Sequence, residues 1–235
     1  MARDSTSEPT PAEVLSFTRA LRTLKREGCS LLVVGRVSSD LHERFSFRML
    51  GDVEHEVRRR LVVLTDGRYG SVERRLPRAC QGPVTETARV VLYEPETRGV
   101  TTTATRRVAP CPTTTAEGDL GDLGETVARE LDRLEVVSNG LEPAELRICL
   151  DSLDTLLATE PPEVVFRFVH LLSTMATSRV GICHVHLHES IDHRYARELA
   201  PLFDATVELS EVGGEPRQRW HLREEALSSA WLPFD

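Results

Sequence analysis

Lysine is almost absent from this chain. Among its 235 residues 29 are basic, and Lys25 is the only lysine, so the other 28 are arginines. Such a complete replacement suggests a high-GC genome, a salt-adapted proteome, or both. Many threonine and acidic side chains agree with salt adaptation, although a formal charge of −8 is modest for it. The acidic balance also argues against nucleic acid as a partner, despite the consecutive Arg58, Arg59 and Arg60.

Paired cysteine motifs and long apolar runs are also missing. The five cysteines form no CxxC pair, which favours buried free thiols in a reducing compartment over a disulfide framework. No apolar run approaches the roughly 20 residues of a membrane-spanning helix, and no signal peptide precedes the first predicted helix. We therefore expect a cytoplasmic protein with no membrane partner.

Short apolar runs alternate with segments of helical periodicity. Strands are predicted at 30–35, 60–65, 89–93, 146–150 and 181–187, with a final hairpin at 205–210 and 217–222. Helical periodicity occurs before Gly28, from Ser38 or Ser39 to Leu50, and over 121–136, 159–175 and 191–203. This alternation predicts an α/β fold: a three-layer, mostly parallel sheet with helices on both faces and a C-terminal β-hairpin.

The predicted organisation is a single domain over residues 10–223. A disordered tip at 1–9 precedes it and a C-terminal tail at 224–235 follows it. A Thr-rich stretch at 100–108 is predicted as a β-ribbon or strand. We expect the aromatic side chains of the tail to pack on the domain body, with a partner surface as the alternative.

The segment 145–157, ELRICLDSLDTLL, is the most informative one in the chain. An apolar, β-rich run places Asp151 at the end of a strand, followed by Ser152 and Asp154. In nucleotide-binding α/β domains an aspartate at this place helps to hold Mg²⁺ beside the phosphates. The alternative is a structural acid that hydrogen-bonds to Ser152 or to neighbouring amides.

The phosphate-binding loop that should accompany this aspartate is degenerate. The working pattern is GxxxxGK[ST], in which backbone amides cradle the phosphates, Lys reaches them and the hydroxyl binds Mg²⁺. After the first predicted strand the chain reads GRVSSDLH at 35–42. Asp40 therefore replaces the second glycine, Leu41 the lysine and His42 the hydroxyl residue. Asp40 also places negative charge where a phosphate should lie.

Some capacity to bind an anion remains in this loop. Gly35, Arg36, Ser38 and Ser39 precede a predicted helix, whose N-terminus attracts anions. With Asp151 they form a vestigial nucleotide site, so we expect no cofactor, with Mg·ATP as the alternative. Amides that converge on a hollow near Asp151 would favour nucleotide binding, whereas a loop filled by its own side chains would oppose it.

A third candidate site is the sequence CHVHLH at 183–188. Because side chains alternate along a strand, His184, His186 and His188 should share one face. Imidazoles with this spacing can hold zinc or another transition metal. Cys183 should point to the opposite face, and no acidic or sulfur ligand is evident beside the histidines. We therefore expect structural histidines and no metal, with a metal site as the alternative.

Residues 146–208 resemble haloarchaeal proteins of unknown function that are built on a RecA/KaiC-like domain. The resemblance is carried by ICLDSLDTLL at 148–157 and VFRFVHLLSTMATSRVGICHVHLHESIDHRYARELAPLFDATVEL at 165–209. The strand-end acid, the FRF-H-L helix, the histidine-bearing strand and the LFDATVE strand occur in the family's order, over about a quarter of the chain. The resemblance implies the P-loop NTPase fold, and it implies that histidines in this strand are a habit of the family.

These features together predict a non-catalytic RecA/KaiC-like domain, or pseudo-ATPase. We expect it to act in regulation or signalling by binding another protein or a second copy of itself. One alternative is a nucleotide-binding or ATP-hydrolysing switch with a non-standard phosphate loop. Another is a metal-binding protein that uses the His-x-His-x-His strand.

Overall fold

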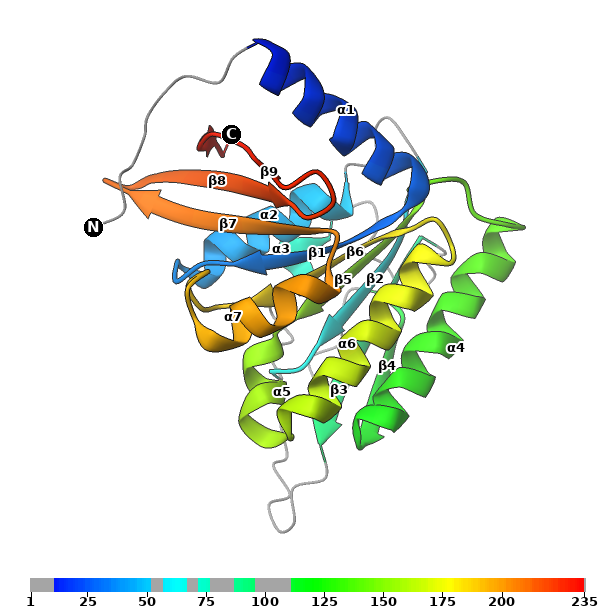
Figure 1. The fold of residues 1–235 in the computed structure, drawn as a ribbon. Helices are drawn as coiled ribbons and strands as arrows, with labels where there is room; N and C mark the ends of the chain where they lie inside the picture. Colours follow the sequence, from blue (N-terminus) through cyan, green and yellow to red (C-terminus); the bar gives the residue numbers. More distant parts are fainter. Residues whose placement is uncertain (1–10, 52–56, 67–71, 77–86, 96–110, 235) are drawn as a thin grey trace.

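The computed structural model describes residues 11–51, 57–66, 72–76, 87–95 and 111–234. The tip predicted at 1–9 and the ribbon predicted at 100–108 lie outside these residues. In the described part, a ten-stranded sheet carries helices on both faces (Figure 1). This architecture confirms the predicted three-layer, mostly parallel α/β fold.

Most strands follow the apolar runs of the sequence. They are β1 (Cys29–Val34), β2 (Arg59–Leu64), β3 (Ala88–Pro95), β4 (Thr113–Gly118), β5 (Leu146–Asp151), β6 (Ile182–Leu187), β7 (Ala205–Val212), β8 (Glu215–Leu222), β9 (Leu227–Ser228) and β10 (Leu232–Pro233). Their order is β10-β8-β7-β1-β6-β5-β2-β3-β4, and β9 pairs with β8. From β7 to β4 all neighbours are parallel. The antiparallel pair β7–β8 is the predicted hairpin.

The main helices follow the predicted periodicity, with shifted ends and two additional short helices. They are α1 (Pro11–Glu27), α2 (Ser39–Leu50), α3 (Val72–Arg75), α4 (Leu120–Ser138), α5 (Leu153–Thr159), α6 (Pro162–Thr177) and α7 (Arg194–Leu199), with a 3₁₀ turn at Ala200–Leu202. The helix predicted from Thr159 begins at Pro162, because Thr159 ends α5. Helices α3 and α5 and strand β4 were not predicted. The two helices are short, and β4, TTTAEG, has no apolar run.

Local signals explain where the main helices begin and end. Ser38 caps α2 by accepting a hydrogen bond from the Leu41 N–H at 3.3 Å. Asp119 and Asp122 form a capping box at the start of α4, and Asn139 ends that helix in the left-handed conformation. Gly28 follows α1 with φ +81°, as its predicted role as a helix stop requires.

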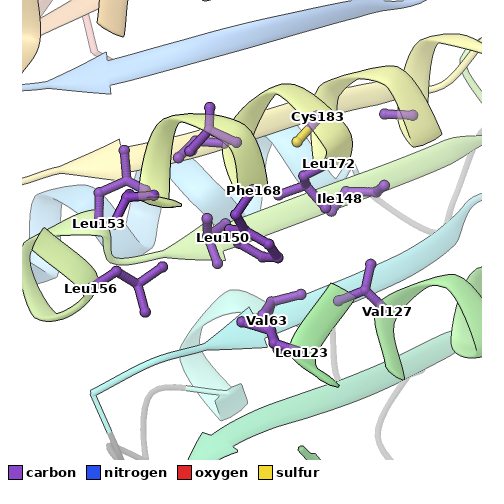
Figure 2. Packing of buried hydrophobic residues seen from close by; sticks show 14 of the residues in the cluster. Val63, Leu123, Val127, Ile148, Leu150, Leu153, Leu156, Phe168, Leu172 and Cys183 are labelled. Carbon is purple, nitrogen blue, oxygen red and sulfur yellow. The ribbon is translucent and has the colours of Figure 1, made fainter. Parts of the chain in front are cut away.

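The two faces of the sheet are covered by different helices. Helices α4 to α7 pack on one face, over the largest apolar cluster of the described residues. Figure 2 shows part of this cluster, in which Phe168 and Leu172 of α6 and Leu123 and Val127 of α4 face aliphatic side chains of the strands. Helices α2 and α3 pack on the opposite face, and α1 covers that face beside β1 and β6. None of the described helices has the length and apolar character needed to span a bilayer.

The end of the chain packs on the domain body, as predicted. Strands β9 and β10 each pair with β8. Phe234 is buried, with its ring centroid 6.2 Å from that of Phe45 in α2. The guanidinium groups of Arg44 and Arg48 lie over the Phe234 ring, at 5.3 and 4.9 Å from its centroid. These contacts fix the outer side of α2, whose inner side faces the candidate site.

Candidate functional site

The candidate site lies at the carboxyl ends of the adjacent strands β1, β6 and β5. Gly35 follows β1, Asp151 ends β5 and His188 follows the last residue of β6. In open α/β sheets this edge is the usual place for ligands. The structure therefore brings the loop, the acid and the histidines, predicted separately, to one edge of the sheet.

The loop after β1 uses its own polar groups internally. The Gly35 N–H donates to the Glu189 carbonyl at 2.8 Å. A Cβ at Gly35 would lie 2.6 Å from the Leu209 carbonyl oxygen, so a larger residue would clash with β7. The Ser38 hydroxyl oxygen is engaged by the helix cap. Two groups that could bind a phosphate therefore already have partners within the protein.

An open pocket of about 490 Å³ lies beside this loop. Gly35, Arg36 and Ser38 line one side of it, and Glu208 and Glu211 of β7 line another. Asp151 is not among the lining residues. Arg36 is largely exposed and lies 3.7 Å from Glu189, a spacing typical of a surface ion pair. Residues of β7 thus line the pocket whereas Asp151 does not, and two carboxylates share its lining with one arginine.

His42 fills the space behind the loop. Its side chain is fully buried, and its Nε2 lies 2.9 Å from the Gly35 carbonyl oxygen. Its Nδ1 lies 2.9 Å from Nδ1 of His186 in β6. In the phosphate-loop pattern this position belongs to the hydroxyl residue that binds Mg²⁺. An imidazole therefore stands between the loop and the carboxyl end of β6.

Asp151 belongs to a buried ion-pair network. Its carboxylate accepts a hydrogen bond from Arg75 of α3, and Arg75 also lies 3.3 Å from Glu43 of α2. The side chains of all three are no more than 4% exposed. Ser152, which was predicted to bond Asp151, donates its N–H to Thr65 Oγ1 instead. The alternative of a structural acid, with Ser152 or neighbouring amides as partners, did not include Arg75, because α3 was not visible in the sequence.

The charge of Asp151 is held by its cationic neighbours. Burial alone would raise the pKa of this carboxyl, but contact with His188 and the charge of Arg75 outweigh burial and hold the pKa well below its usual range. His188 Nε2 lies 3.3 Å from Asp151 Oδ1. Asp151 is thus ionised at neutral pH and neutralised from within the protein.

The three histidines of the strand share one face, as predicted. Ring centroids are 5.3 Å apart for His184 and His186 and 6.4 Å apart for His186 and His188. Cys183 packs in the apolar cluster on the other face of the sheet, also as predicted. His184 and His186 are fully buried, whereas the His188 side chain is 29% exposed. His188 therefore forms the solvent side of the group.

A sulfur atom does lie beside the histidines, contrary to the sequence interpretation. Cys149 of β5 pairs in register with His184 of β6. Two overlapping groups have potential ligand atoms within 4.8 Å of one another: His42, His186 and His188, and Cys149, His184 and His186. Cys149 could have been found from the sequence, since it lies two residues before Asp151 on one strand and must share its face. The part played by His42 depends on helix packing.

Burial keeps the inner histidines neutral. Burial, together with the charge of His188, lowers the pKa of His42 to about 4. Burial, together with the charges of Arg147 and Arg75, lowers the pKa of His184 to about 3. Burial also lowers the pKa of His186 well below its ordinary value. For His188, burial is outweighed by contact with Asp151 and by the charges of Asp151 and Asp154, which raise the pKa. The group therefore offers neutral imidazoles inside and a more basic one at its mouth.

Comparison with known proteins places the chain in a family. Curated proteins give no match to it. Residues 28–209 match a family of unknown function, DUF7504, over a span that begins just before β1 and ends within β7. That span contains the loop, the ion-pair network and every histidine of the site. Because it covers well over half of the sequence, the chain belongs to the family DUF7504.

Proposed function

We propose that the protein is a non-catalytic domain of the RecA/KaiC-like type that acts in regulation or signalling by binding another protein. The observation that carries this proposal is the internal use of the groups that would handle a nucleotide. His42 fills the space behind the loop, Ser38 caps its helix, and Asp151 pairs with Arg75 and lies 3.3 Å from His188 Nε2. A phosphate or Mg²⁺ would have to displace these partners.

Electrostatics in the loop also support this proposal. Asp40 lies in the first turn of α2, where the positive end of the helix dipole would otherwise attract an anion. Glu208 and Glu211 add negative charge to the neighbouring pocket. A nucleoside triphosphate entering this pocket would meet two carboxylates and one arginine, Arg36, with Asp40 in the neighbouring first turn of α2.

The experiment is a calorimetric titration with Mg·ATP together with a turnover assay, at several salt concentrations. We expect neither saturable binding at millimolar nucleotide nor hydrolysis above the buffer rate. Asp151→Asn is the informative variant, because it keeps the shape of the side chain beside Arg75. Hydrolysis by the wild-type protein that is lost in this variant would overturn the proposal, provided that circular dichroism shows both proteins folded.

A nucleotide-binding switch with a non-standard loop is the second candidate. The pocket beside Gly35, Arg36 and Ser38 favours it, since these residues precede a helix N-terminus. If this candidate holds, Arg36→Ala should weaken Mg·ATP binding, whereas the exposed Arg194→Ala on α7 should not. The same titration therefore separates the two candidates.

The partner is expected to be a protein, either a different chain or a second copy of this one, in the cytoplasm. Light scattering coupled to size exclusion tests self-association directly. The single lysine and 28 arginines support a salt-adapted, haloarchaeal origin. A melting temperature that rises steadily with KCl would support this origin, and one that falls would contradict it.

A further inference from the structure

The head-to-head contact of two buried imidazoles is the starting observation. His42 Nδ1 and His186 Nδ1 face each other at 2.9 Å, and neither side chain reaches solvent. Two nitrogens on one tetrahedral zinc ion lie about 3.3 Å apart, given zinc–nitrogen bonds of about 2.0–2.1 Å. A separation of this kind between rings from α2 and β6 needs only a small adjustment to admit an ion.

The far nitrogen of each ring has a partner that sets its proton. His42 Nε2 faces the Gly35 carbonyl oxygen, which can only accept, so Nε2 carries the hydrogen and Nδ1 of the neutral ring presents a lone pair. His186 Nε2 lies 2.8 Å from Ser46 Oγ, whose hydroxyl is directed at the His42 carbonyl at 3.1 Å. When the Ser46 hydroxyl donates to the His42 carbonyl, His186 Nε2 donates to Ser46 Oγ. The lone pair of His186 Nδ1 then faces the lone pair of His42 Nδ1.

Two facing lone pairs repel each other unless a cation, either a shared proton or a metal ion, lies between them. Metal-bound histidines typically donate their other ring N–H to a carbonyl, hydroxyl or carboxylate, which fixes the tautomer and the ring orientation. His42 and His186 both have such partners, Gly35 and Ser46.

His188 completes the set. Its ring centroid lies 4.1 Å from that of His42, and a ring nitrogen of each of the three histidines lies within 4.8 Å of the other two. Asp151 Oδ1 lies 3.3 Å from His188 Nε2 and has no hydrogen-bond partner among the described residues. A carboxylate behind a histidine is the arrangement that orients imidazoles at zinc sites.

We propose that His42, His186 and His188 bind a divalent transition metal ion, with zinc the expected occupant. Three imidazoles suit zinc, copper, nickel or iron, and a fourth position would open toward solvent on the side of the partly exposed His188. This site is independent of the proposed regulatory function, since an ion among the histidines neither requires nor supplies a nucleotide.

A neighbouring set, Cys149, His184 and His186, competes for the same ion. Neither ring nitrogen of His184 has a hydrogen-bond partner in the described part of the chain, so nothing orients this ring as a ligand. Burial raises the pKa of the Cys149 thiol to about 12, and a thiolate would have to form where no solvent reaches it. The three-histidine set needs neither step.

The test uses the full chain with any affinity tag removed. The protein is stripped with a chelator, reloaded with Zn²⁺ in competition with a chromophoric chelator, and its metal content is measured by mass spectrometry. His188→Ala removes the partly exposed ligand without opening the buried interior. His170→Ala, on the exposed side of α6, is the matched histidine control. Co²⁺ loading reports the ligand type through its visible spectrum.

We expect one zinc ion per chain in the wild-type protein and in the His170→Ala variant. His188→Ala should weaken zinc binding by more than the roughly 10–100-fold that losing an outer partner costs. Cys149→Ser should bind as the wild-type protein does, and the Co²⁺ protein should show no thiolate charge-transfer band. Substoichiometric zinc, or zinc unaffected by His188→Ala, would overturn the site.

Loss of zinc in Cys149→Ser together with a thiolate band would also overturn it, because the ion would then lie in the neighbouring set. The outcome is separable from that of the nucleotide experiment. Mg·ATP hydrolysis with stoichiometric zinc would overturn the proposed function and leave the metal site standing. The absence of both would overturn the metal site alone.

Discussion

The face of the sheet covered by α4 and α6 is lined by aliphatic side chains, whereas the face covered by α2 and α3 holds titratable groups at the same depth. Adjacent residues of the same strands supply both linings. Toward α4 and α6 project Ile148, Leu150, Cys183 and Val185, and toward α2 and α3 project Cys149, Asp151, His184 and His186. Since the backbone is shared, the difference between the faces comes from side-chain chemistry alone.

The comparison separates what holds the fold together from what costs it stability. Each buried aliphatic side chain contributes roughly 1.5–3 kcal/mol by leaving water. A buried polar or charged group costs free energy unless it is paired. The aliphatic face, seen in Figure 2, therefore stabilises the fold without such a cost. The buried polar groups of the titratable face cost stability, and we therefore place the candidate function there.

Acid should destabilise the protein through the titratable face, and this is the largest effect that we expect. The unfolded chain binds protons at His42 and His184 below about pH 6.5, whereas the folded chain resists them until about pH 4 and 3. The unfolded state therefore binds more protons, and the protein becomes less stable as the pH is lowered. For His42 alone the difference is about 3 kcal/mol. Burial of His186 acts in the same direction.

The raised pKa of His188 acts in the opposite sense, because its contribution is full below pH 6.5 and is lost only as pH rises. Asp151, with its lowered pKa, adds to the loss at still lower pH. Urea unfolding with a chelator present, from pH 7 to about pH 4, measures the net effect of the histidines. A free energy of unfolding that stays flat over this range would contradict the assigned difference between the faces.

Arg75→Met should cost about 3–5 kcal/mol, because it leaves the buried carboxylates of Asp151 and Glu43 without their shared cation. Arg74→Met is the matched control. Arg74 also pairs with Glu43, but its side chain is 60% exposed, so its loss should cost less than about 1 kcal/mol. Equal losses in the two variants, measured by chemical denaturation, would show that Arg75 does not hold this face together.

Leu150→Ala tests the aliphatic face one residue from Asp151. Leu150 is fully buried, and its truncation should cost about 2–4 kcal/mol through lost transfer energy and a cavity. Val136→Ala, at a 79% exposed position of α4, should change stability by less than about 0.5 kcal/mol. Unlike the pair loss at Arg75, this loss should not depend on pH, and a pH-dependent loss would mean that the faces are coupled.

The sequence was sufficient for the aliphatic face and for part of the other. Apolar runs and helical periodicity predicted most strands and the main helices, and strand alternation placed His184, His186 and His188 together. Strand β4 was missed because threonines without an apolar run give no periodic signal. Helix α3 was missed because four residues are too few to give a periodic signal.

The contacts of the titratable face were harder to foresee. Arg75 reaches Asp151 across 76 positions of sequence, and His42 reaches His186 across 144. Pairings of this range depend on the strand order β1-β6-β5-β2, which places β1 and β5 on either side of β6. No local pattern determines that order. Only Cys149 was within reach of the sequence, through its spacing from Asp151.

His184→Leu should give the smallest change in stability, and that change should be zero or a gain. His184 is fully buried, and its ring nitrogens have no hydrogen-bond partner among the described residues. A buried polar group without a partner costs about 1–3 kcal/mol, so an apolar side chain of similar size should leave stability unchanged or raise it by up to about 2 kcal/mol. The variant should also flatten the acid response, since one proton-binding difference is removed. A clear loss of stability in chelator would mean that His184 has a partner in solution, and the titratable face would then be better satisfied than its contacts indicate.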